Sequence, residues 1–133
     1  MRAIVIRESL QDGELPDDLH GMFLKAYPHL LDETTEIEII ELAVAEEHAL
    51  GVAMGLAAVL LPRLYYAHVL GKDSMYVAFP NCITLVRRDQ PETADRAQAI
   101  GRLFGIPLSH MRFAEMFEVD HPDAAGPARE RTG

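Results

Sequence analysis

The sequence predicts an α+β fold, in which a mainly antiparallel sheet carries helices on one face. Short runs rich in β-branched residues alternate along the chain with segments whose apolar residues have helical spacing. Three such short runs follow one another after residue 64, with turn-forming residues between them, which indicates a meander. The stretch from Ala49 to Leu61 is apolar or Gly throughout, which is typical of a helix buried on several sides.

The length of 133 residues is close to the commonest domain size, so we expect one domain over residues 1–119. Pro, Gly and charged residues dominate residues 120–133, which predicts a loose C-terminal tail. An apolar fraction of 49% beside 25% charged residues is the balance of a globular chain rather than a disordered one.

The net charge of −9 is concentrated in the first third of the chain. Up to Glu47 there are 12 acidic residues and only three basic ones, whereas the remainder carries nine of each. Proteins that bind nucleic acid usually show a basic surface instead. We therefore expect no nucleic-acid partner.

Several features favour a cytoplasmic protein. Cys82 is the only cysteine, so no intramolecular disulfide can form. The apolar run near the start is too short for a signal peptide. The apolar run from Ala49 to Pro62 has 14 residues, whereas a bilayer span needs about 20, so no membrane association is expected.

The first elements are predicted to be a strand and a helix. β-branched residues between Ala3 and Ile6 indicate a strand over residues 2–8 that is buried on both faces. Pro16 and two acidic residues are typical of a helix start, and Pro28 would end or kink that helix. Its apolar stripe at helical spacing comprises Leu19, Met22, Phe23, Ala26 and Leu30.

Residues 32–44 allow two interpretations. Thr35 and Glu38 form a capping box that would start one long helix ending at Leu61. Alternatively, residues 36–44 form a strand whose apolar and acidic residues alternate if one bulge lies near Ile40, followed by a helix over 45–61. We adopt the second interpretation, because β-branched residues favour strands and the single helix would be unusually long.

The second half is predicted to be a meander, a helix and a last strand. The meander strands are residues 65–70, 74–79 and 82–88. Asp89, with Glu92 three residues on, is predicted to cap a helix over 90–104, and a strand over 110–119 follows. This half resembles part of a ferredoxin-like unit.

Hairpin registers assign the faces of the meander. A three-residue loop after Leu70 would pair Leu70 with Ser74, and a two-residue loop at Pro80 would pair Tyr76 with Leu85. One face is then almost wholly apolar and is expected to hold the helices. Proline disfavours the common two-residue turns, so a longer loop is expected at Pro80, and that loop would exchange the faces of Cys82 and Arg87.

The other face of the meander combines aliphatic side chains with a few polar ones, which is typical of ligand sites. We predict Tyr66, His68, Tyr76 and Arg87 as ligand-binding residues on this open face. Arg87 favours an anionic group and the rings favour an aromatic body. The sequence therefore predicts a small homo-oligomeric domain that binds a small anionic, aromatic molecule.

Two alternatives remain open. In the first, the protein is an isomerase, cyclase or hydrolase in which the catalytic residue His68 moves a proton. In the second, it is a structural or regulatory oligomer without a ligand. A histidine on a strand is more often a hydrogen-bonded ring than a catalyst, and no signature supports Cys82 as a nucleophile. The histidines show no metal-ligand spacing, so we expect no metal and no cofactor.

Overall fold

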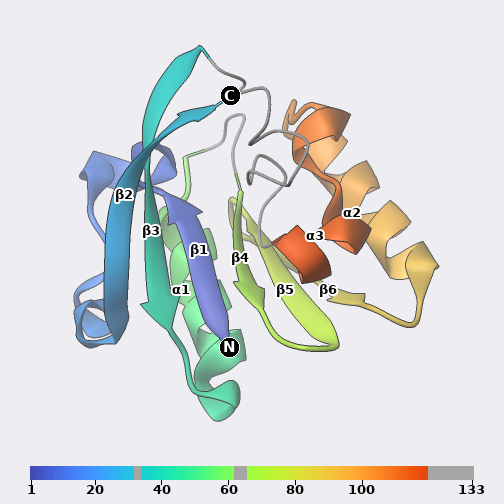
Figure 1. The fold of residues 1–133 in the computed structure, drawn as a ribbon, viewed down its shortest axis with the longest axis horizontal. Helices are drawn as coiled ribbons and strands as arrows, with labels where there is room; N and C mark the ends of the chain where they lie inside the picture. Colours follow the sequence, from blue (N-terminus) through green and yellow to red (C-terminus); the bar gives the residue numbers. More distant parts are fainter. Residues whose placement is uncertain (32–33, 62–65, 120–133) are drawn as a thin grey trace.

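The structure is a computed structural model that describes residues 1–31, 34–61 and 66–119. Its described strands form one six-stranded antiparallel sheet in the order β2-β3-β1-β4-β5-β6. In Figure 1 helix α1 (Ala49–Val59) lies behind the sheet, α3 (Phe113–Val119) lies in front of it and α2 (Pro91–Leu103) lies at the right, beyond β6. Both α2 and α3 pack on the face opposite α1. The α+β class is confirmed, but the prediction that the helices share one face is wrong. The predicted tail over 120–133 lies outside the described residues.

The strands are β1 (Arg2–Ile6), β2 (Phe23–Leu31), β3 (Thr35–Ala43), β4 (Ala67–Leu70), β5 (Ser74–Phe79) and β6 (Cys82–Arg87). Strand β1 lies between β3 and β4, and its side chains belong to apolar clusters on both faces of the sheet. Ala3, Ile4 and Val5 are accordingly at most 3% exposed. A continuous apolar run is what a central strand needs, and the prediction of this strand is confirmed.

Strand β3 confirms the second interpretation of residues 32–44. It pairs with β1 on one side and with β2 on the other, so ladder hydrogen bonds on both edges favour the strand over the long helix. Helix α1 begins at Ala49 rather than at residue 45, because Glu46–His48 form a 3₁₀ turn. The predicted bulge near Ile40 is absent, since both ladders run through this residue in register.

The helix predicted after Pro16 is wrong. Only Asp17–Met22 form a helical turn, of the 3₁₀ type, and the following residues enter β2 and pair with β3. Without β2, the outer edge of β3 would expose its backbone donors and acceptors, and pairing outweighs the helical spacing of the side chains. Pro28 is tolerated because β2 is an edge strand.

The strand predicted over 110–119 is also wrong, because this segment contains α3. Its apolar side chains fit both the strand period and the helix period. The fully buried residues are Met111, Phe113 and Met116, and the last two are spaced by about one helical turn. Helix α2 agrees closely with the predicted helix. Its cap position is Gln90 rather than Asp89, without a side-chain cap.

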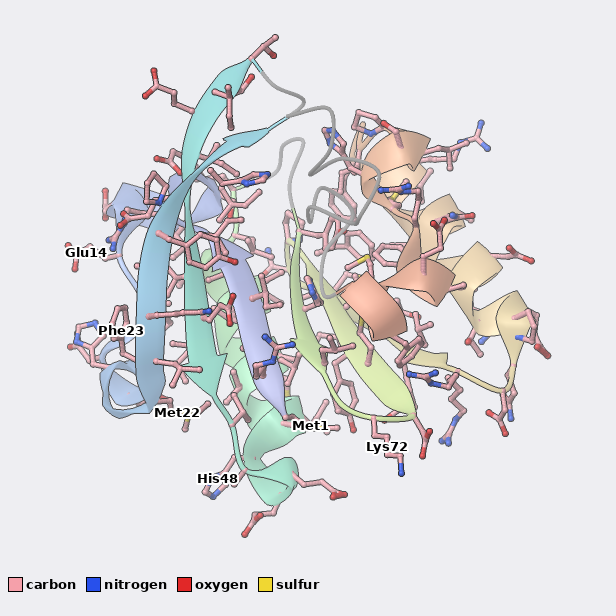
Figure 2. All side chains as sticks on the ribbon, viewed as in Figure 1. Met1, Glu14, Met22, Phe23, His48 and Lys72 are labelled. Carbon is pink, nitrogen blue, oxygen red and sulfur yellow. The ribbon has the colours of Figure 1, made fainter. Side chains whose placement is uncertain are left out.

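Two large apolar cores lie on opposite sides of the sheet, and side chains project from both faces (Figure 2). A smaller cluster comprises Ile4, Ile37 and Ile39. The first large core lies under α1 and includes Val5, Leu42 and Leu56. The second lies under α2 and α3 and includes Phe79 and Phe113. Helix α1 is therefore covered on its inner side by the sheet, while its outer side carries the exposed residues Leu50 and Met54. The expectation that other elements surround this helix is wrong for the described chain.

Candidate functional site

The β4–β5 hairpin has a register one residue away from the predicted one. Leu70 pairs with Met75 and Val69 pairs with Tyr76, so the predicted pairing of Leu70 with Ser74 is wrong. The amide of Gly71 donates to the carbonyl of Ser74 across the turn at 2.9 Å. A slip of one residue exchanges the faces of every side chain beyond it.

The β5–β6 hairpin, in contrast, has the register of a two-residue loop. Tyr76 pairs with Leu85, and the turn consists of Pro80 and Asn81. Asn81 has a positive φ of 56°. Proline followed by a residue with positive φ is the order that a type II turn requires. The expectation of a longer loop at Pro80 is wrong. The turn that differs from the prediction is the one between β4 and β5.

The predicted ligand-binding residues are consequently divided between the two faces of the sheet. Tyr66 and His68 lie on the side of α2 and α3, where they are 7% and 2% exposed. Tyr76 and Arg87 lie on the side of α1, where Tyr76 is half-buried and Arg87 is exposed. The prediction that the four share one open face is wrong.

Tyr66 connects the segment before α3 to the sheet through a hydrogen bond and a ring contact. Its hydroxyl donates to the carbonyl of His110 at 2.5 Å, and its ring meets the edge of Phe113 at 5.2 Å between centroids. Burial raises the pKa of Tyr66 well above its ordinary value near 10, and the positive charge of Arg112 opposes this effect. The imidazole ring of His68 lies beside the Tyr66 ring, with 5.9 Å between the two ring centroids. A substrate would have to enter the core to reach it.

A buried carboxylate, Glu41, lies on the same side of the sheet and was missed by the sequence reasoning. Glu41 is 3% exposed. Arg2 Nη1 donates to one of its oxygens at 3.2 Å, and the Tyr27 hydroxyl donates to the other at 2.8 Å. The assumed bulge near Ile40 had placed Glu41 on the solvent side, whereas unbroken alternation after Ile39 would have placed it inside.

Glu41 and His68 belong to one row of side chains across three strands. Ile4 of β1 pairs with Glu41 on β3 and with His68 on β4. The next row toward the start of β1 contains Arg2, which pairs with Leu70. Arg2 thus connects the buried polar row to the end of the sheet.

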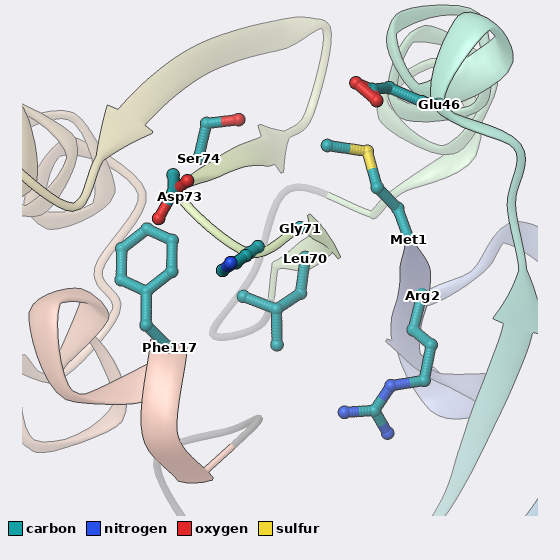
Figure 3. A pocket seen from close by; sticks show the side chains of 9 residues that line it. Met1, Arg2, Glu46, Leu70, Gly71, Asp73, Ser74 and Phe117 are labelled. Atoms are coloured by element: carbon teal, nitrogen blue, oxygen red, sulfur yellow. The ribbon is translucent and has the colours of Figure 1, made fainter.

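A cavity of about 700 Å³ opens at that end, and we call it the Arg2 pocket (Figure 3). The strand β1, the β4–β5 turn and α3 supply most of its walls. Its lining residues are Met1, Arg2, Glu46, Leu70, Gly71, Lys72, Asp73, Ser74 and Phe117. Two cationic and two anionic side chains therefore face one cavity, with apolar side chains between them.

Close packing positions the walls of the Arg2 pocket. A Cβ atom on Gly71 would lie 2.4 Å from Met1 Cε and 3.2 Å from the Ser74 carbonyl oxygen, so a larger residue would require the Met1 side chain to move. Figure 2 shows Met1 and Lys72 at the same end of the sheet. Arg88 connects two further walls of the pocket, the β4–β5 turn and α3. Its Nε donates to the Lys72 carbonyl at 3.1 Å, and its guanidinium lies 5.0 Å from the centre of the Phe117 ring.

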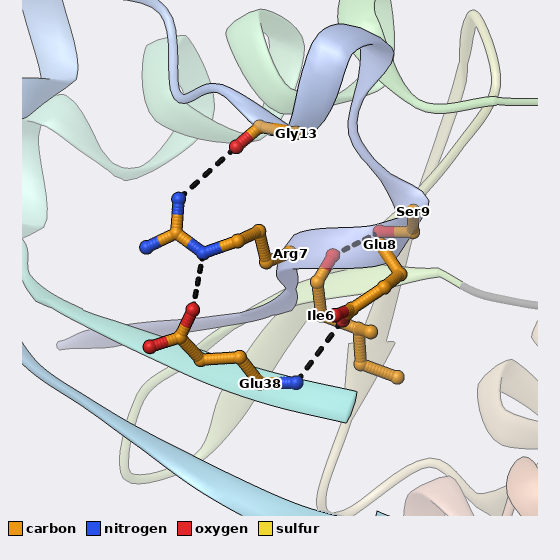
Figure 4. Close-up of polar contacts among 6 residues, drawn as sticks. All are labelled: Ile6, Arg7, Glu8, Ser9, Gly13 and Glu38. Atoms are coloured by element: carbon orange, nitrogen blue, oxygen red, sulfur yellow. Dashed lines mark hydrogen bonds and ion pairs between the residues drawn. The ribbon is translucent and has the colours of Figure 1, made fainter. Parts of the chain in front are cut away.

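A second cavity, of about 610 Å³, lies beside β2 and β3 and is lined partly by Glu8, His29, Glu36 and Glu38. Arg7 pairs with Glu38 there, and the Glu38 amide donates to Glu8 Oε1 at 3.0 Å (Figure 4). Two of the carboxylates in this cavity, those of Glu8 and Glu38, thus already have partners within the protein. Within the described residues, no group of three or more His, Cys, Asp or Glu side chains is placed to hold a metal ion.

Comparison with known proteins adds no family to this description. No protein-family model matches the chain, and neither a similar curated protein nor a similar solved structure was found. The ferredoxin-like character of the second half therefore stays a prediction. No helix in the described part of the chain is long and apolar enough to cross a membrane.

Proposed function

We propose that the protein binds a small zwitterion, of the size of an amino acid with an apolar side chain, in the Arg2 pocket. One observation carries the proposal. Arg2 and Lys72 face the same cavity as Glu46 and Asp73, so both signs of charge are available to one ligand. A volume of about 700 Å³ is within the range of small-molecule sites.

Arg2 is suited to hold the carboxylate of such a ligand. A guanidinium presents several N–H donors in a planar fork, and Nη1 of this fork donates to Glu41. The pair with Glu41 fixes the side chain before a ligand arrives, which lowers the entropic cost of binding. Lys72 adds a second positive charge at the turn.

The ammonium group of the ligand would face Glu46 and Asp73. Both side chains are exposed, so they remain solvated and can accept hydrogen bonds from a cation. The side chains of Met1, Leu70 and Phe117 provide the apolar contact that a ligand body needs. A ligand with only a negative charge would be attracted by Arg2 and Lys72 but repelled by the carboxylates of Glu46 and Asp73.

This proposal keeps part of what the sequence predicted and moves the site. The ligand still carries an anionic group, and Phe117 supplies an aromatic wall in place of Tyr66 and Tyr76. No observation in the described chain favours the enzyme alternative, because His68 is buried and does not line the cavity. A cytoplasmic location and self-association belong to the same proposal.

Calorimetric titration with three compounds that share one body tests the charge requirement. Phenylalanine carries both charges, phenylpropanoate only the anion and phenethylamine only the cation. We expect phenylalanine to bind more tightly than phenylpropanoate, and phenethylamine to bind least. Equal binding of all three compounds, binding of none, or a preference for the amine would contradict the proposal.

Two variants that each remove one positive charge test whether the ligand binds in the Arg2 pocket. Lys72→Gln should weaken phenylalanine binding by a factor of about 1.4 to 5, because an exposed charge pair contributes roughly 0.2–1 kcal/mol. Arg96→Gln removes one positive charge from the exposed side of α2 and should leave the affinity unchanged. If the two variants lose affinity equally, net charge rather than the Arg2 pocket decides binding.

A further inference from the structure

Helix α1 presents an apolar surface to solvent, which we call the outer α1 face. It comprises Leu50, Gly51, Met54, Gly55 and Ala58 of the helix, together with Leu61, which lies two residues beyond the helix end. Leu50, Met54 and Leu61 are 48%, 56% and 38% exposed. The opposite side of the helix is packed on the sheet through Val52 and Leu56. A helix that is apolar on all sides normally has partners on all sides, so this face lacks one within the described chain.

The two glycines of this face have no packing role among the described residues. A Cβ atom on Gly51 or on Gly55 would contact no described atom within 4 Å. Glycine weakens a helix relative to alanine, so its presence twice on one face calls for a different reason. Small residues spaced by four create a groove that allows another helix to approach closely.

We propose that the outer α1 face is the contact surface for a second copy of this chain, with the two α1 helices antiparallel across a two-fold axis. A two-fold contact requires one surface that is complementary to itself. Leu50, Met54 and Ala58 form a ridge with a spacing of four residues, and Gly51 and Gly55 form the groove beside it. The ridge of each copy then enters the groove of the other.

The charges around α1 are compatible with this arrangement. The outer α1 face itself bears no charge, although the chain carries a net charge of −9. The nearest acidic residues in sequence are Glu46 and Glu47, at the start of the helix. An antiparallel arrangement separates the two acidic helix starts by roughly the length of the helix, about 17 Å, which exceeds the screening length of about 10 Å. Parallel helices would bring these carboxylates together.

A stable dimer on this side of the sheet would need a contact area larger than α1 alone. A stable interface buries about 800 Å² per partner, whereas one helix face about 17 Å long and 10 Å wide supplies only a part of it. Half-buried apolar side chains of the adjacent strands extend the surface, namely Tyr76, Ile83 and Leu85. Tyr76 and Arg87, both predicted as ligand-binding residues, then lie in or beside a subunit contact.

Sedimentation velocity of the full chain at micromolar concentration tests the proposal. We expect twice the monomer mass of 14.8 kDa. Met54→Glu should convert the protein to a monomer, because the two-fold axis brings two carboxylates together in an apolar contact. Leu103→Glu is the matched control, since Leu103 is 86% exposed on α2 and away from this face. A monomeric wild type, or a Met54→Glu variant that remains dimeric, would overturn the proposal.

Gly55→Ala distinguishes the glycine groove from a merely apolar surface. Alanine strengthens a helix and meets no atom within 4 Å here, so the monomer should melt at a higher temperature. The added methyl group would fill the groove, so the dimer dissociation constant should rise by about tenfold. These opposite effects on melting and on association are the expected signature. A Gly55→Ala dimer as tight as the wild type would contradict the ridge-in-groove contact.

Discussion

Arg2 and Glu41 join the neighbouring strands β1 and β3 through a contact of 3.2 Å between guanidinium and carboxylate. The Glu41 side chain is 4% exposed, whereas that of Arg2 is 37% exposed and faces the Arg2 pocket. The pair therefore has a buried and a solvent-facing end. We expect stability to depend on the first end and the proposed ligand binding to depend on the second.

Arg2→Met should lower the free energy of unfolding by about 1–3 kcal/mol, because it leaves a buried carboxylate with one donor fewer. Urea denaturation followed by circular dichroism measures the change. Arg96→Met, on the exposed side of α2, should stay within about 0.5 kcal/mol of the wild type. Equal stability of the two variants would show that Glu41 does not need Arg2.

Tyr66 should make the protein less stable in alkali. Its pKa is raised in the folded state, so the folded protein keeps a proton that the unfolded chain loses above about pH 10. The stabilisation is complete below that pH and is lost as the pH rises further. Urea denaturation at about pH 9 and pH 11 should show a smaller decrease for Tyr66→Phe than for the wild type. Identical decreases would show that other groups cause the alkaline effect.

Gly101→Ala should destabilise the protein, unlike alanine substitutions elsewhere in helices. A Cβ atom there would lie 2.1 Å from Met111 Sδ and 3.1 Å from Phe79 Cε1, both in the buried core. Overpacking of this kind costs about 1–3 kcal/mol. Ala99→Gly, on the exposed side of the same helix, measures helix propensity alone and should cost about 1 kcal/mol. A more stable Gly101→Ala variant would show that Met111 moves aside freely.

Asn81→Ala should cost about 1–2 kcal/mol, because alanine disfavours the positive φ of 56° at this position. Asn81→Gly should be nearly neutral, since glycine accepts this conformation. Thermal melting compares the two variants. Equal melting temperatures would indicate that the turn changes its conformation after substitution.

Elements with one dominant signal could be predicted from the sequence. The β-branched run of β1 and the proline start of α2 each pointed to a single structure. The segment after Pro16 could not be predicted in this way, because its helical spacing was outweighed by the unpaired edge of β3. The α3 segment fitted both the strand and the helix period, so its packing on the second core decided the outcome.

The candidate site depended on single-residue details that turn composition does not fix. One additional residue in the β4–β5 turn separated Tyr66 and His68 from Tyr76 and Arg87. One assumed bulge near Ile40 concealed Glu41 on the solvent side. The Arg2 pocket combines residues from the start of β1, the turn after Leu70 and α3, which only the tertiary structure brings together.

The most direct test of the proposed function is a titration of the ¹⁵N-labelled protein with phenylalanine, followed by amide chemical shifts. We expect saturable shifts for Arg2 and for the turn residues Gly71, Lys72 and Asp73, with little change on the outer side of α2. Shifts confined to Tyr76 and Arg87 would contradict it and would return the site to the opposite face. An unchanged spectrum at millimolar phenylalanine would also contradict the proposal.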